Sequence, residues 1–288
     1  MYCSHSDRHR YNMEHSTRGI AICHIVLFLS SVVAFCLLST QQVVGQTSVL
    51  SHSATFTSNE ELHYKISFKW GIVRGRIGYV TITNRATKGG QYFSQLLMRT
   101  TGIAETFYSM RDTLETLYGV DKMPLRFEKR INDKGYYSED ISTFSYTSRQ
   151  VKVNNRQKVK GEICIDTTFV FNRSNKAIID LLSSLAMVRT YDFVSPSEGR
   201  SMRAVVPLAD TKTDIEYVFK GFETIMMPDG SQKQAMKIGI NVEDKNFNTN
   251  KNSVIVWLTR DKAQIPVRLQ AELAIGAAVV ELTDYYKK

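Results

Sequence analysis

The chain has 288 residues, of which 43% are hydrophobic and 23% charged, and its formal net charge is +9 at pH 7. These proportions are typical of a globular protein and exclude a disordered or fibrous chain. The positive charge is spread over the whole length, so it favours contact with anionic surfaces without requiring it.

The first 45 residues have the organisation of a secretory signal peptide. A polar leader is followed by an apolar stretch over residues 19–38, and residues 43–45 form a short cleavage site. We therefore expect export to the periplasm, with cleavage near Gly45. The expected mature chain has a flexible tail over residues 46–57 and a single β-rich domain over residues 58–288.

The leader allows two alternatives. Met13 could serve as the start, because a short charged segment still precedes the apolar stretch. The apolar stretch could also be retained as an anchor, since about 20 apolar residues can span a bilayer. A lipid anchor is not expected, because Cys23 and Cys36 each follow a large apolar residue, which does not fit a lipoprotein signal.

Cleavage would remove most of the groups that metal or nucleophile chemistry uses. Three of the four cysteines and four of the six histidines lie in the leader, which leaves Cys164, His52 and His63. Such a chain can form neither an intramolecular disulfide nor a structural zinc site. We therefore predict no cofactor, no metal, no catalytic residue and a protein that is not an enzyme.

The first predicted strand covers residues 60–70 and alternates with period two. His63 falls on its polar face, where we expect a plain solvent-exposed residue. Its opposite face is apolar and consists of Leu62, Tyr64, Ile66, Phe68 and Trp70. This alternation is typical of an antiparallel strand with one buried face. The glycines that follow, Gly71, Gly75 and Gly78, are interpreted as hairpin and bulge residues because no helix follows them.

Turn clusters at residues 88–90 and 132–135 separate further strands, and residues 102–110 suggest a short helical turn. The stretch 149–160 is strongly basic. Because Asn154 and Asn155 resemble a turn, we expect a solvated hairpin tip there. The alternative is a docking patch for an anionic membrane surface, acidic glycans or an envelope protein, made by Lys152, Arg156, Lys158 and Lys160. Nucleic acid is not an expected partner, because no recognition module is visible.

Acidic residues suggest a remote alternative, a carboxylate-based hydrolase. A glycosidase needs two correctly spaced carboxylates. The sequence does not show which carboxylates would lie close together, and the candidates are Asp112, Glu115, Asp180, Asp214 and Glu216. Arg111 and Asp112 are interpreted as an ion pair at a strand entrance. Cys164 lies beside Glu162 and Asp166, which would raise the pKa of its thiol, so a reactive nucleophile is not expected.

Residues 176–191 break the alternation. Apolar residues recur there at helical spacing, at Ile178, Leu181, Leu182, Leu185 and Val188. Ser174 or Asn175 could cap the start, and the helix dipole would favour Asp180 near that end and Arg189 at the other. We predict an amphipathic helix that packs on the sheet, with an exposed membrane-surface helix as the alternative.

The remaining chain returns to strands. Residues 215–219 and 236–242 alternate and are joined by a turn at 228–230, and residues 265–275 alternate as well. About twelve strands exceed what an open sheet holds without curling. We therefore predict a mostly β fold, a strongly curved antiparallel sheet or half-barrel meander with one amphipathic helix. Its concave face would bind an apolar ligand or lipid through Tyr64, Phe68, Trp70, Tyr217, Phe219, Leu182 and Leu185.

Four stretches together resemble a known family. They are the tyrosine-rich strand and glycine hairpin at 62–75, the block at 101–125 with Arg111 and Asp112, the helix motif at 180–189, and the closing strands at 257–276. Their order resembles the exported bacterial domain-of-unknown-function family 3108, in its Bacteroidetes form. The resemblance implies export and a β-rich fold only, because the family has no assigned activity that could be carried over. The alternative function is a non-catalytic interaction or scaffold protein of the cell envelope, in which the aromatic residues simply fill the core. No oligomeric state is predicted.

Overall fold

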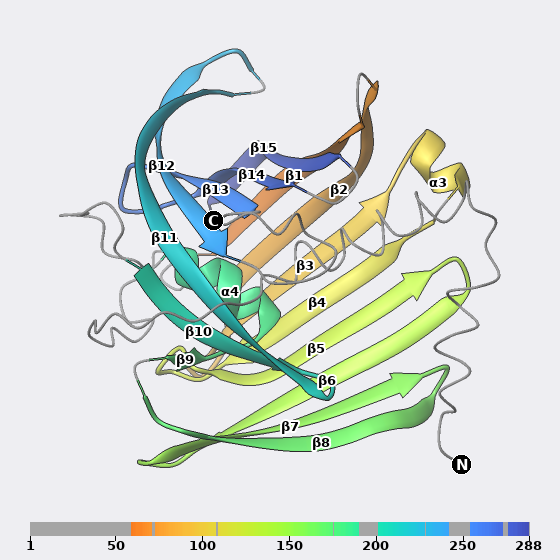
Figure 1. The fold of residues 1–288 in the computed structure, drawn as a ribbon, viewed down its shortest axis with the longest axis vertical. Coiled ribbons are helices and arrows are strands. Elements are labelled where there is room, and N and C mark those ends of the chain that lie inside the picture. The colour runs from red at the N-terminus through yellow and green to blue at the C-terminus, as the bar shows by residue number, and fades with distance from the viewer. Residues whose placement is uncertain are drawn as a thin grey trace.

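Alternating apolar and polar residues form fifteen strands that make one sheet, accompanied by two short helices (Figure 1). The computed structural model describes residues 59–70, 73–107, 109–174, 176–189, 201–227, 229–241, 254–272 and 276–287. The predicted signal peptide and tail lie outside the described residues, as do Gly71, Pro228 and Tyr191. No helix in the described ranges is long and apolar enough to span a membrane.

The first half of the sheet is a meander with one short helix. Its elements are β1 (Glu60–Trp70), β2 (Val73–Ala86), β3 (Tyr92–Thr100), α3 (Ile103–Phe107), β4 (Arg111–Tyr118), β5 (Pro124–Asp133), β6 (Tyr136–Tyr146), β7 (Gln150–Val159) and β8 (Glu162–Asn172). The predicted helical turn is α3, and the turn predicted at 132–135 connects β5 and β6 with Lys134 and Gly135 at positive φ. The sequence therefore predicted β1, the helical turn and the turn at 132–135 of this half.

The second half contains the longer helix and a second meander. Its elements are β9 (Ala177–Ile178), α4 (Leu181–Val188), β10 (Ser201–Leu208), β11 (Thr211–Met226), β12 (Gln232–Asn241), β13 (Val254–Thr259), β14 (Pro266–Glu272) and β15 (Ala277–Lys287). The turn between β11 and β12 closes through Gly230, whose φ is +83°, and Asp229, whose carboxylate accepts from Ser231.

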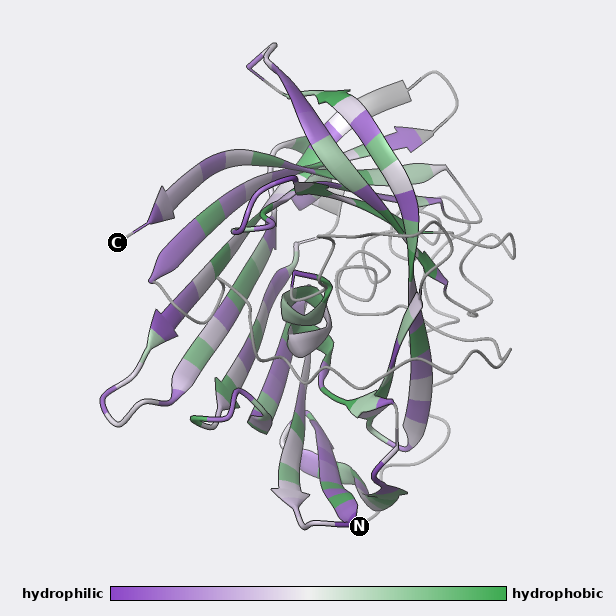
Figure 2. Cartoon of the chain, turned by 90° about the vertical axis from the view of Figure 1, so that its left-hand side faces the viewer, coloured by the Kyte–Doolittle hydropathy of each residue, from purple (hydrophilic) through white to green (hydrophobic). Residues whose placement is uncertain are grey.

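The strand order is β8-β7-β6-β5-β4-β3-β2-β1-β15-β14-β13-β12-β11-β10-β9, and among the described strands only the β9–β10 pair is parallel. The sheet curls until its second half contacts its first half, since the Asn155 side chain of β7 donates to the carbonyl of Ala209 after β10 (3.2 Å). Figure 2 shows the sheet wrapped around α4. The prediction of a strongly curved, mostly β fold with a helix packed on the sheet is confirmed, and the sheet is nearly closed into a barrel.

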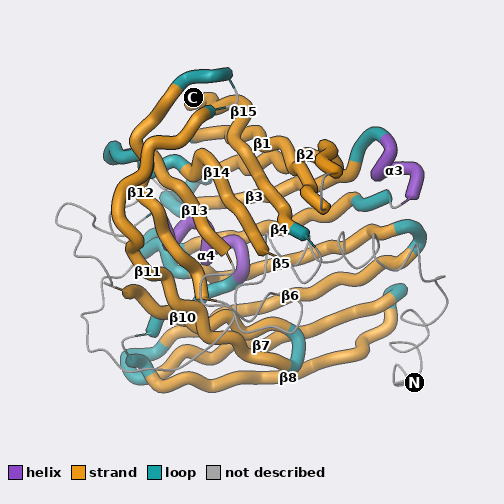
Figure 3. Tube along the Cα trace, turned by 45° about the horizontal axis from the view of Figure 1, so that its top comes forward, coloured by secondary structure: helices purple, strands orange, loops and turns teal. Residues whose placement is uncertain are grey.

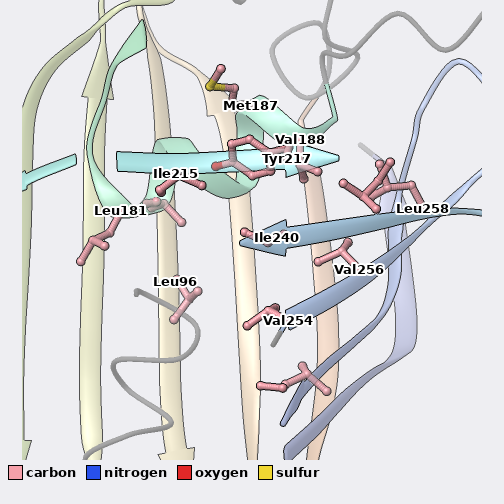
Figure 4. Packing of buried hydrophobic residues seen from close by; sticks show 14 of the residues in the cluster. Leu96, Leu181, Met187, Val188, Ile215, Tyr217, Ile240, Val254, Val256 and Leu258 are labelled. Carbon is pink, nitrogen blue, oxygen red and sulfur yellow. The ribbon is translucent and has the colours of Figure 1, made fainter. Parts of the chain in front are cut away.

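The inner face of the sheet and one side of α4 form the hydrophobic core. The apolar face predicted for β1 points inward, with Leu62, Tyr64 and Ile66 buried. Figure 4 shows the α4 residues Leu181, Met187 and Val188 beside side chains of the opposite wall. Each large apolar side chain buried in this way stabilises the fold by about 1.5–3 kcal/mol. The core thus joins both halves of the sheet through the helix.

Helix α4 is shorter than predicted and has a different cap. It begins at Leu181, and the Asp180 side chain accepts a hydrogen bond from the Ser183 amide, so Asp180 is the N-cap in place of Ser174 or Asn175. Ile178 belongs to β9, which pairs with Ala204 and Val205 of β10. The expected start at residue 176 is wrong because backbone pairing to β10 competes with helix formation there.

The turn predicted at Asn154 and Asn155 is also wrong, because β7 runs through both residues. Asn155 points into the barrel, where its amide donates to Ala209, and Asn154 donates to Asp166 across the strand pair (3.1 Å). The chain turns instead at Lys160 and Gly161, whose φ angles are +52° and +88°. Contacts to other strands therefore decide against the local turn preference of the two asparagines.

Gly78 fits the interpretation as a bulge residue. The β1–β2 register shifts between Ile66 and Ser67, directly opposite Gly78. A Cβ atom at this position would clash with the carbonyl of Arg99 on β3. Glycine is therefore required where the bulge brings β2 and β3 close together.

Candidate functional site

A pocket lies between α4 and the inner face of β1, β2 and β3. Its volume is about 320 Å³, including the part open to solvent. The sheet wall contributes Leu62, Tyr64 and Ile82, and the helix wall contributes Leu182, Leu185 and Ala186. A mostly apolar wall of this kind is typical of small-molecule sites. The enclosed part of the pocket is about 20 Å³, which is room for about one water molecule, and the rest is open to solvent.

The polar part of the pocket is the outer end of a row of inward-facing polar residues. In register across β1, β2, β3 and β4, Glu60 lies opposite Asn84, Asn84 opposite Ser94, and Ser94 opposite Thr116. All four are buried. The Ser94 hydroxyl donates to Asn84 (2.5 Å), and the Asn84 amide donates to Glu60 (2.7 Å). These two hydrogen bonds therefore join β1, β2 and β3, and Thr116 extends the row in register on β4.

Arg189, at the C-terminal end of α4, binds one end of this row. Its guanidinium donates to both carboxylate oxygens of Glu60, at 2.5 and 3.2 Å, and to the carbonyl of Ala263. The two charged side chains are only 4% and 1% exposed. This ion pair neutralises the only cation that lines the pocket among the described residues.

Asp180, at the N-terminal end of α4, binds the other end of the row. Its carboxylate accepts from the Thr116 hydroxyl (2.9 Å), the Ser183 amide (2.8 Å) and the Ser183 hydroxyl (2.6 Å). The Tyr118 hydroxyl lies 3.2 Å from the Ser183 hydroxyl and also bonds to Ser94. Helix α4 is therefore held at both ends by buried polar contacts.

The spacing of these two contacts fits the geometry of the elements. Nine residues separate Asp180 from Arg189, and a helical rise over that length is about 13.5 Å. Three strand spacings separate β1 from β4, which is about 14 Å. A helix lying across the strands with this length places one charged end at Glu60 and the other at Thr116.

Burial determines the titration of Asp180. Removal from water raises the pKa of its carboxyl group, although hydrogen bonds from Ser183 and Thr116 oppose the shift. Burial likewise raises the pKa of the Tyr64 and Tyr118 hydroxyls. The polar row is therefore an environment that disfavours additional negative charge.

Replacing Asp180 with Asn should make the protein progressively more stable than the wild type as the pH rises. The folded wild type holds the Asp180 proton more tightly than the unfolded chain, whose pKa is about 3.9. Its stability contribution is therefore complete below that pH and is lost as pH rises through the raised folded pKa. An asparagine keeps the acceptor for the Ser183 amide. Urea denaturation of both proteins from acid to neutral pH measures the difference.

The control for this variant is Asp180→Ala, which removes the cap and leaves the Thr116 and Ser183 hydroxyls without their acceptor. It should cost about 1–3 kcal/mol. A difference between Asp180→Asn and the wild type that does not change with pH would contradict the raised pKa.

Some of the predicted ligand-binding residues line the pocket, and others lie outside it. Tyr64, Leu182 and Leu185 line it, and the Tyr64 hydroxyl donates to the carbonyl of Pro266 (3.0 Å). Tyr217 and Phe219 are buried in the core on β11, outside the pocket lining. Phe68 is half-buried against the core. Trp70 ends β1, and its side chain lies outside the described residues.

The predicted carboxylates do not converge on one site. Glu115 accepts from Arg130, Asp214 from Lys176 and Glu216 from Arg203, all in partly exposed pairs. Asp112 and Asp180 are the buried members. Asp180 serves as the helix cap and accepts a hydrogen bond from Thr116. Asp112 lies four residues before Thr116 on β4, which is about 13 Å along the strand, so the two buried carboxylates are far apart.

The predicted ion pair between Arg111 and Asp112 is wrong. Adjacent strand residues point to opposite faces, so Arg111 lies outside the barrel and Asp112 inside it. Arg111 pairs with Glu105 of α3 (2.6 Å), and this hydrogen bond lowers the pKa of Glu105 to about 2. Among the described residues, no group of three or more histidines, cysteines or carboxylates is arranged to hold a metal ion.

The basic residues predicted as a patch lie along β7 and its turn. Lys152 and Arg156 are exposed, Lys158 is half-buried, and Lys160 is in the turn. Arg156 pairs with Asp166 and Lys158 with Glu139, each at 2.9 Å. Two of the four positive charges are therefore balanced by neighbouring carboxylates. His63 lies on the outer face of β1, as predicted, but it is half-buried there and contacts Glu61 (2.7 Å) and the Tyr286 ring, so it is not a plain solvent-exposed residue.

Sequence and structure comparisons give a consistent result. A family model described as "Protein of unknown function (DUF3108)" matches residues 63–283. The fold is similar to a crystal structure of a beta-barrel-like protein of domain of unknown function DUF1849 from Brucella abortus, with a TM-score of 0.56 at 9% identity. That alignment covers 80% of this chain and 98% of the other. A search of the curated proteins finds no match.

Proposed function

The chain belongs to the DUF3108 family of proteins of unknown function, and we propose that it is an exported, non-catalytic binding protein of the cell envelope that holds an apolar ligand between α4 and β1–β3. The observation that carries this proposal is the pocket with apolar walls on both sides and a polar end. Export is supported by the composition of the leader.

The charges around the pocket favour a ligand with an uncharged polar end. Glu60 already balances Arg189, and the other polar lining groups are the neutral Asn84 and Ser94. A carboxylate placed there would be desolvated without a free cation, which costs several kcal/mol. A hydroxyl or ester group would meet the amide and hydroxyl of the pocket instead. We therefore expect a neutral amphiphile, such as a monoacylglycerol, in preference to a fatty acid.

The second candidate function is an interaction or scaffold protein of the envelope. The burial of Tyr217 and Phe219 favours it, because aromatic residues predicted to contact ligand are packed in the core. On this proposal the pocket is a small packing gap, and the outer surface carries the function. The two candidates differ in one measurable property, whether the pocket takes up a ligand.

Filling the pocket should abolish ligand binding without unfolding the protein. Ile82 lines the pocket and is half-buried, so Ile82→Trp puts an indole into the space that the ligand would occupy. We expect monoacylglycerols of medium chain length to raise the Tm of the wild type and to leave the Tm of Ile82→Trp unchanged, because only the folded, open pocket binds them. Fatty acids of equal length should shift the wild type less.

The matched control is Thr83→Trp, because adjacent strand residues point to opposite faces and Thr83 lies outside the barrel. This variant should respond to monoacylglycerols as the wild type does. Organic extraction of the purified wild type followed by mass spectrometry tests for a ligand retained from the cell. An empty wild type whose Tm no lipid changes would refute ligand binding and leave the scaffold function.

A further inference from the structure

The outer surface of β1–β4 carries a group of basic residues near α3. In register, Tyr79 of β2 lies opposite Arg99 of β3, and Arg99 lies opposite Arg111 of β4. Arg76 of β2 places its guanidinium over the Tyr79 ring, 5.2 Å from the ring centre. Lys69 of β1 lies on the same outer side of the sheet. The four basic residues are all exposed, and we call them the basic face.

Carboxylates compensate only part of the positive charge of the basic face. Glu105 of α3 pairs with Arg111 (2.6 Å). Among the described residues, no carboxylate forms an ion pair with Lys69, Arg76 or Arg99. Farther along the same surface, outward-facing basic residues are paired with carboxylates. Because like charges directly opposite each other destabilise a sheet, the pair of Arg99 and Arg111 would be stabilised by an anionic partner.

An apolar side chain stands beside the basic face. Ile103 is the first residue of α3 and is 79% exposed, the highest value among the large hydrophobic residues that the structure describes. The Glu105 carboxylate holds α3 in this place, because it accepts from Arg111, Thr100 and Ser109. Figures 1 and 3 show α3 at the margin of the sheet, where β3 ends and β4 begins. Exposed apolar residues among basic ones are typical of proteins that bind the surface of an anionic membrane.

We propose that the basic face and Ile103 dock on the surface of an anionic phospholipid bilayer. The arginines would bind lipid phosphates, which a guanidinium contacts with two parallel N–H donors. Ile103 would enter the boundary between the headgroups and the acyl chains. The exposed isoleucine favours a bilayer over an acidic polysaccharide, because only the bilayer offers it an apolar contact. All of these residues lie outside the barrel, so the proposal does not depend on the pocket beside α4.

Sedimentation with lipid vesicles tests the contribution of charge. The mature chain should bind vesicles of phosphatidylglycerol mixed with phosphatidylcholine, and it should not bind vesicles of phosphatidylcholine alone. Each basic residue near an anionic surface raises the affinity about fivefold, so Arg76→Gln with Arg99→Gln should weaken binding about 25-fold. The matched control is Lys152→Gln with Lys233→Gln, which removes two exposed charges from β7 and β12. It should change the affinity little, because salt screens charges that lie far from the bilayer.

A second variant tests the apolar contact. Ile103→Ser keeps every charge and should weaken binding to the phosphatidylglycerol vesicles about tenfold. The control is Val170→Ser on β8, where the valine is 56% exposed, and it should bind as the wild type does. The Tm of each variant without lipid checks that it is folded.

Three results would overturn the proposal. They are a wild type that does not bind the phosphatidylglycerol vesicles, control variants that lose as much affinity as the test variants, and an Ile103→Ser variant that binds as tightly as the wild type. The last result, together with binding to dextran sulfate that Arg76→Gln with Arg99→Gln weakens, would identify an acidic polymer as the partner.

Discussion

Replacing Arg189 with Met should lower the free energy of unfolding by about 3–5 kcal/mol, because removal of one partner leaves the other charge buried. Glu60 would lose two hydrogen bonds from the guanidinium. The Asn84 amide and the Tyr285 hydroxyl would remain as donors, but neither carries a charge. The carbonyl of Ala263 would lose its donors as well. Urea denaturation, monitored by tryptophan fluorescence, measures the loss.

The double variant Arg189→Met with Glu60→Leu separates the effect of the buried charge from the effect of packing. Replacement of a whole buried ion pair by apolar residues is often close to neutral, so the double variant should recover most of the stability that the single variant loses. If Arg189→Met alone costs less than about 1 kcal/mol, the pair is not buried in solution and the C-terminal end of α4 is not held there.

Much of the fold was predictable because alternation with period two shows which side of each strand is buried. On β1 the predicted apolar residues Leu62, Tyr64 and Ile66 are all buried, and the curvature follows from the number of strands. The ends of α4 were not predictable in the same way. Ile178 satisfies both the helical spacing and the pattern of a strand, and only its pairing with Val205 of β10 decides between them.

The polar row beneath α4 was missed although the sequence carries a signal for it. Glu60, Asn84, Ser94 and Thr116 each occupy a position in their strand where the alternation calls for an apolar residue. One such exception is easily dismissed, and four become meaningful only when the strands are placed in register. The pair of Glu60 with Arg189 spans 129 residues, and no local pattern connects residues that far apart.

The apolar part of the pocket was predicted more completely than its polar part. Tyr64, Leu182 and Leu185, which line the pocket, were identified from periodicity. An apolar residue on the buried face of a strand or helix must contact either the core or a ligand. The distinction between these two roles is not encoded in periodicity. Tyr217 has the same pattern as Tyr64 and lies in the core, where its hydroxyl donates to the carbonyl of Ser184 (3.1 Å).

Truncation of Leu182 to Ala should cost about 2–5 kcal/mol, the usual loss for a buried leucine. Leu182 is 3% exposed and lies between the core and the pocket, so the lost methyl groups leave a cavity on the helix. The half-buried Leu185 provides the comparison. Leu185→Ala removes the same atoms from a more exposed site, and it should cost less. Chemical denaturation of both variants measures the two losses.

The size of the Leu182→Ala loss distinguishes two roles for α4. A movable lid belongs to the less stable parts of a structure, so a lid would give a small loss together with altered ligand retention. Asp180 and Arg189 fix both ends of α4 to the sheet through buried contacts, which favours a fixed plug and the large loss. A loss below about 0.5 kcal/mol with unchanged ligand content would contradict both roles, since a buried leucine cannot be truncated at so small a cost; it would place this face of the helix against an external partner or a membrane surface.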